Sequence, residues 1–200
     1  MFDSIVKGGY CMIPIILCSI ISLAITIERF FSLRDEKIHP EEFVAKVKKL
    51  LTRDKIDEAV SLCNTNNSPI AKILEAGIFR RHKNRDKIKE AIEHAGRQEA
   101  NKLQRYLPAL SIISSIAPSL GLLGTVFGMI KAFEVIYTVG IGEPAALSKG
   151  ISEALITTAA GLLVAIPTVV IYGYFYKKSN NYILEMEDTS MELLDMLTEE

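Results

Sequence analysis

The chain has 200 residues, and its 23 lysine and arginine residues balance 24 aspartate and glutamate residues to a formal net charge of −1. This balance argues against nucleic acid as the main partner, and the sequence shows neither a glycine-rich phosphate loop nor cysteines and histidines at metal-site spacing, so we expect no cofactor and no metal. Because 49% of the residues are hydrophobic and 24% are charged, the two kinds must be segregated along the chain, as in a membrane protein with a soluble portion.

The first predicted membrane span covers residues 8–27, which carry no formal charge and end at Glu28 and Arg29. At about 1.5 Å rise per residue, a stretch of this length crosses a hydrocarbon core about 30 Å thick. We assign residues 1–31 to a periplasmic N-terminus and the first transmembrane helix.

Residues 32–105 form a polar loop that holds 17 of the 23 lysine and arginine residues. Cationic loops stay on the cytoplasmic side, so this segment is predicted to be a cytoplasmic helical loop. Helix starts are predicted at Pro40, Asp54, Ser68–Pro69 and Asn84, and the last helix is expected to continue straight into the membrane. A basic cluster in the loop either contacts anionic lipid heads or is a solvated face: Arg80, Arg81, Lys83, Arg85, Lys87 and Lys89.

The second predicted span follows at residues 106–138, and its uncharged part ends before Lys131. Small residues recur along it and share one helical stripe: Ala117, Gly121, Thr125, Gly128 and Ala132. Such a stripe lets membrane helices approach closely. For the glycines we predict packing, and for Thr125 both packing and function stay open. Residues 139–149 are predicted to form a short periplasmic loop.

The third predicted span, residues 150–178, has 23 uncharged residues between Glu153 and Lys177. A carboxylate close to the membrane is costly and usually faces a bundle interior or an aqueous path, so Glu153 indicates an ion route. The alternative is that Glu153 lies at the water interface, where the positive end of the helix dipole favours an acid. Residues 179–200 are predicted to prolong this helix into a cytoplasmic tail.

Three features together resemble the ExbB/TolQ/MotA proton-channel family, closest to its ExbB and TolQ branches. They are Glu28–Arg29 at the end of the first span, PSLGLLGTVFGMIKAF in the second and GISEALITTAAGLLVAIPTVVIYGYF in the third. The resemblance implies an inner-membrane homo-pentamer around two helices of a separate ExbD- or TolR-like partner, which supplies the proton-carrying aspartate. The expected fold is an all-α membrane protein with three transmembrane helices, the second and third extended into a cytoplasmic helical domain.

The function implied by this resemblance is not enzymatic. A motor subunit would use the proton motive force, with its partner and a TonB-like protein, to energise outer-membrane transport. Three alternatives stay open: TolQ-like envelope maintenance, a flagellar-stator-like motor, and a passive membrane scaffold without ion transfer. The transported ion is expected to be H⁺, with Na⁺ as the alternative.

The resemblance also implies roles for single residues. The predicted ion pathway comprises Thr125, Glu153, Thr157 and Thr158, although alanine is usual in the family where this chain has Thr157. On an ideal helix Thr157 lies about 40° from Glu153 and Thr158 about 140° away, so either the helix is distorted or the two threonines face different neighbours. Helix packing is predicted for Gly121, Gly124, Gly128, Gly161, Pro118 and Pro167.

Overall fold

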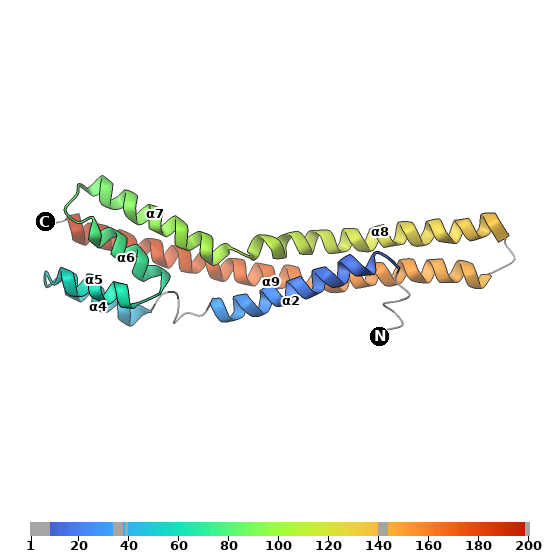
Figure 1. The fold of residues 1–200 in the computed structure, drawn as a ribbon, viewed down its shortest axis with the longest axis horizontal. Coiled ribbons are helices and arrows are strands. Elements are labelled where there is room, and N and C mark those ends of the chain that lie inside the picture. Colours follow the sequence, from blue (N-terminus) through green and yellow to red (C-terminus); the bar gives the residue numbers. More distant parts are fainter. Residues whose placement is uncertain (1–8, 34–37, 39, 140–143, 199–200) are drawn as a thin grey trace. The chain divides into compact units, whose positions relative to one another are not determined.

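The computed structural model describes residues 9–33, 38, 40–139 and 144–198 (Figure 1). Every regular element in these residues is a helix, and they contain no strand. Three helices are long and apolar enough to cross a membrane: α2 (Met12–Ser32), α8 (Leu107–Val139) and the first part of α9 (Pro144–Thr198). The predicted fold class, an all-α membrane protein with three spans, is therefore confirmed.

The chain divides into two compact units. The membrane unit combines the chain up to Glu28 with Tyr106–Tyr174, and the loop unit combines Arg29–Arg105 with the chain from Phe175 onward. Within the membrane unit, α8 and the first part of α9 run side by side in opposite directions (Figure 1). Their outward faces carry large apolar side chains such as Leu163, which is 73% exposed, as expected where lipid or another membrane helix is the neighbour.

The loop unit combines four helices with the C-terminal part of α9 (Figure 1). They are α4 (Glu41–Leu51), α5 (Ile56–Thr65), α6 (Pro69–Phe79) and α7 (Arg85–Gln104). The largest fully buried side chains include members from four of these five elements: Val47, Ile70, Ile78, Ile88 and Leu193. An apolar core therefore joins the tail of α9 to the loop that precedes the second span.

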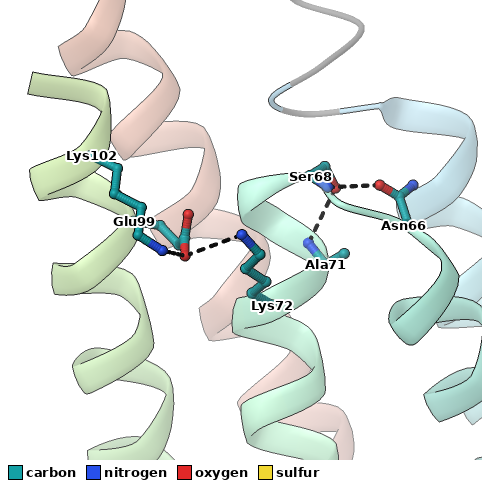
Figure 2. Close-up of polar contacts among 6 residues, drawn as sticks. All are labelled: Asn66, Ser68, Ala71, Lys72, Glu99 and Lys102. Atoms are coloured by element: carbon teal, nitrogen blue, oxygen red, sulfur yellow. Dashed lines mark hydrogen bonds and ion pairs between the residues drawn. The ribbon is translucent and has the colours of Figure 1, made fainter.

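Local signals in the sequence explain where two loop helices begin. Ser68 Oγ accepts a 3.3 Å hydrogen bond from the Ala71 N–H, and Pro69 occupies the first helical position of α6. The Ser68 N–H in turn donates to Asn66 Oδ1 at 2.8 Å, which closes the preceding turn (Figure 2). Asn84 caps α7 in the same way, because its side chain accepts from the Lys87 N–H at 3.3 Å.

The start of α5 differs from the prediction. Asp54 was expected to begin the helix, but it adopts φ 55° in the turn after α4, and α5 begins at Ile56. Aspartate tolerates this left-handed conformation better than most residues. The Asp54 N–H donates to the Leu51 carbonyl at 2.9 Å, so the turn is closed by a backbone bond.

The fourth loop helix leads into the second span, as predicted, with a short interruption between the two helices. α7 ends at Gln104 and α8 begins at Leu107, with a turn at Arg105 and Tyr106. Pro108 has no N–H, so it cannot donate to the carbonyl four residues earlier, and this interrupts the helical ladder. At the other end of the second span, α9 already begins at Pro144, within residues 139–149, which were predicted to form a loop.

Candidate functional site

Glycines hold α8 and α9 together along one seam. A Cβ on Gly121 would lie 3.1 Å from Thr158 Cα, one on Gly128 would lie 2.7 Å from the Gly150 carbonyl oxygen, and one on Gly161 would lie 2.5 Å from the Ala117 carbonyl oxygen. Real Cβ atoms essentially never lie under 3.0 Å from backbone atoms, and 3.1 Å is tighter than nine in ten real Cβ contacts. The two helices therefore approach as closely as their backbones permit, which is the packing that small-residue stripes allow in membranes.

The predicted small-residue stripe includes Thr125, but Thr125 does not lie in the seam between α8 and α9. The seam position is Gly124, whose Cβ would lie 2.5 Å from Thr157 Cβ. Thr125 is half-buried beside the seam, and its hydroxyl donates to the Leu122 carbonyl at 2.6 Å. The role of Thr125 in an ion pathway stays a prediction.

The two threonines of α9 have different neighbours. Thr157 is completely buried against Gly124, and its hydroxyl donates to the Glu153 carbonyl at 2.6 Å within its own helix. Thr158 is half-buried, and its hydroxyl donates across the seam to the Gly121 carbonyl at 3.2 Å. The sequence left two alternatives, a distorted helix or different neighbours for the two threonines, and the structure agrees with different neighbours. The burial of Thr157 gives it a packing role within the chain, and a place for it along an ion path stays a prediction.

Glu153 forms an ion pair with Lys131 near the C-terminal end of α8 and the start of α9. Lys131 Nζ lies 2.5 Å from Glu153 Oε1, and the Glu153 side chain is only 14% exposed. Sequence reasoning used Lys131 only to mark the end of the second span and missed this pairing. The pairing depends on the antiparallel register of α8 and α9. The register that sets Gly128 against Ala154 also brings Lys131 to Glu153.

Comparison with known proteins adds the family. Residues 65–188 match the MotA/TolQ/ExbB proton channel family. The chain belongs to this family. An ExbB-like biopolymer transport protein of Synechocystis sp. is 32% identical over 175 residues, which are 86% of this chain and 69% of that protein. ExbB of Pseudomonas putida is 29% identical over 96% of this chain and 60% of its own length. TolQ of Pseudomonas aeruginosa is 39% identical over 49% of this chain and 44% of its own length.

The match to the MotA/TolQ/ExbB family confirms the resemblance drawn from the sequence motifs. It spans α6, α7, α8 and most of α9, and so contains every residue of the predicted ion pathway. The chain covers less than two thirds of several relatives, including 64% of an ExbB homologue from Methanothermobacter thermautotrophicus. The first span lies outside the matched region, but its Ser22 and the Thr168 of α9 form a buried hydroxyl pair at 2.8 Å.

The loop unit of this family member holds a buried carboxylate that sequence reasoning also missed. The Glu99 side chain is 6% exposed and lies between two lysines, with Lys102 Nζ at 2.6 Å and Lys72 Nζ at 3.7 Å (Figure 2). The pairing satisfies a charge that would be costly if buried alone. Through these lysines Glu99 links α7 to α6. Among the described residues no group of three metal-ligating side chains occurs.

Proposed function

We propose that the chain is the ring-forming subunit of an ion-driven motor in the cell inner membrane, which uses the proton motive force to energise TonB-dependent transport across an outer membrane. The observation that carries this proposal is family membership over the two motif-bearing spans. Glu153 directly precedes the uncharged run of α9 and lies within the residues that match the family. ExbB relatives, which are named biopolymer transport proteins, support the transport branch.

The proposed assembly is a homo-pentamer with α8 and α9 lining a central pore and α2 outside. The pore would hold two helices of an ExbD/TolR-like partner that carries the ion-binding aspartate. Exposed apolar side chains on the membrane unit support a pore wall that excludes a continuous chain of water: Leu122, Val126 and Leu162. The N-terminus would be periplasmic, and residues 32–105 and 179–200 cytoplasmic, because the loop carries most of the positive charge.

The proposed mechanism converts ion movement into movement of the partner. One elementary charge that crosses 100 mV releases about 2.3 kcal/mol, and this energy is lost if ions leak through the ring. A polar patch formed by the hydroxyls of Thr125 and Thr158 would let the partner's aspartate load and release protons in turn. The apolar wall on either side would prevent leakage, so the partner must turn or shift for each proton that passes.

TolQ-like envelope maintenance is the second candidate. The TolQ protein of Pseudomonas aeruginosa, named as a Tol-Pal system protein, is 39% identical over 102 residues. The two functions share the ring, the pore and the partner's aspartate, and they differ in the envelope component that the partner moves. A neighbouring gene for a single-span protein with an intramembrane aspartate would support both, and the gene for its periplasmic target would separate them.

Variants in the pore test the motor proposal. Glu153→Ala is expected to leave assembly intact and to abolish ion-driven work, and Thr158→Ala and Thr125→Val are expected to impair it. The readout is growth under the condition that limits the transported nutrient, with the oligomeric state followed by native mass spectrometry in mild detergent. The matched control is Thr26→Ala on α2, whose hydroxyl donates only within its own helix, to the Ser22 carbonyl at 2.7 Å.

Two outcomes would contradict the proposal. Growth at wild-type rates in all three pore variants would leave a passive scaffold as the better explanation. A monomer in mild detergent would contradict the ring itself, because the pore then has no walls.

A further inference from the structure

Glu153 has a counter-ion within its own chain. The Lys131 ammonium lies 2.5 Å from its carboxylate, and the side chains are 46% and 14% exposed respectively. The Glu153 carboxylate is therefore largely shielded from solvent, whereas the Lys131 side chain that contacts it stays partly exposed. An ion pair of this kind is held more firmly than a fully exposed pair, and removal of one partner leaves a poorly solvated charge.

A third segment, the residues just before α2, also lies against the Glu153 carboxylate. A Cβ on Gly9 would overlap Glu153 Oε1, and Gly9 has φ +67°, a conformation that glycine adopts without strain. The Tyr10 ring lies 5.9 Å from Lys131 Nζ, within the range of a cation–π contact. The segment before α2, the end of α8 and the start of α9 thus meet at one charged pair.

We propose that Glu153 acts as a fixed charge paired with Lys131, and that it is not the group that takes up and releases the transported ion. This inference rests on the motor function proposed above. A carboxylate that exchanges ions must part from its counter-ion in every cycle, whereas three segments of one chain leave the Glu153 side chain only 14% exposed beside the Lys131 ammonium. Lys131 is then a positioning residue that orients Glu153.

Charge reversal distinguishes a fixed pair from an ion-exchanging carboxylate. In the ring assembled with its ExbD/TolR-like partner, Lys131→Met and Glu153→Gln are each expected to lose ion-driven work, and Lys131→Arg is expected to keep it. The double variant Lys131→Glu/Glu153→Lys is expected to regain work that neither single reversal supports, because the pair is restored with its charges exchanged. Lys149→Met, at an exposed position of α9, is the matched control and should behave as wild type.

The double reversal decides the proposal. If it stays inactive while it assembles as wild type and Lys131→Arg works, a carboxylate is needed on α9 itself, and the fixed-pair inference is overturned. A failure of the motor proposal looks different, because the wild-type ring would then do no ion-driven work with its partner.

A second measurement does not depend on motor activity. Thermal unfolding of the purified ring is compared for Lys131→Met, Glu153→Gln and the combination of both. If the two side chains form an enclosed pair, the double variant is expected to lose clearly less stability than the two single losses added together. Additive losses would show that the side chains do not interact, and would overturn the inference even if the reversal cannot be assembled.

Discussion

Gly124 and Thr157 face each other across the seam between the second and third spans: a Cβ on Gly124 would lie 2.5 Å from Thr157 Cβ and 2.6 Å from its hydroxyl oxygen. Thr157 is completely buried there. Its hydroxyl donates to carbonyls of its own helix, at 2.6 Å to Glu153 and 3.1 Å to Ala154. A β-branched residue can therefore occupy this seam because the facing position has no side chain and because its own polar atom is satisfied.

Substitution of Gly124 by alanine tests this contact. Gly124→Ala is expected to force α8 and α9 apart, at a cost of about 1 to 3 kcal/mol typical of overpacking. The matched control is Gly173→Ala on α9, where a Cβ would meet nothing within 4 Å. Because alanine favours helix over glycine, this control should be neutral or stabilising by up to about 1 kcal/mol. Thermal unfolding in detergent measures both, and equal losses would contradict the close seam.

Arg29 is predicted to stabilise the end of α7. Its guanidinium is buried, with 3% of the residue exposed, and Nη1 donates to the Leu103 carbonyl at 2.8 Å. Arg29→Met removes a cation and a donor from a helix C-terminus, where both are favourable. We expect a loss of about 2 kcal/mol, within the range for hydrogen bonds from charged groups.

Hydrogen exchange and thermal unfolding check the Arg29 prediction. Exchange should become faster at the backbone amides of the last turn of α7. Arg97→Met is the control, because its side chain is 69% exposed and its guanidinium is 4.0 Å from Glu93. If Arg97→Met costs as much as Arg29→Met, the stabilisation does not come from the buried helix end.

The Cys63 thiol is predicted to make stability fall at high pH. Burial, and then the nearby Glu75 carboxylate, raise the pKa of Cys63 from 9.0 to about 11. Between these values the unfolded thiol loses its proton while the folded one keeps it, so the free energy of unfolding decreases as pH rises from about 9 to 11. Cys63→Ala should show a shallower decrease in denaturant titrations over this range. Identical slopes for the two proteins would contradict the shifted pKa.

The isolated ring is expected to conduct almost no protons. Glu153 lies at the start of its span, and the uncharged runs of the three spans contain no aspartate or glutamate, so no carboxylate lies at mid-depth. Hydroxyls cannot store the charge, and the partner's aspartate must supply the missing group. Liposomes that contain the chain alone should therefore show negligible flux with a pH-sensitive dye. Strong flux without the partner would show a complete path within this chain.

Much of the fold follows from the sequence because its signals are local. Uncharged runs of span length, the charge of the loop, and caps such as Ser68 and Asn84 each act within one segment, and the structure has helices where they predict them. The turn at Arg105 and Tyr106 was missed, although Pro108 is a local signal, because no glycine or proline marks a turn before the apolar run begins at residue 106. The family motifs were also readable, since they are contiguous stretches in two spans.

Tertiary structure decided which of these residues meet. The sequence placed Thr125 in the small-residue stripe, and the antiparallel register of α8 and α9 put Gly124 at the contact. The same register paired Lys131 with Glu153 and gave Thr157 and Thr158 different neighbours. Helical periodicity fixes the face on which a side chain lies, whereas the partner of that face depends on how two segments slide along each other, and only close packing of their backbones sets that position.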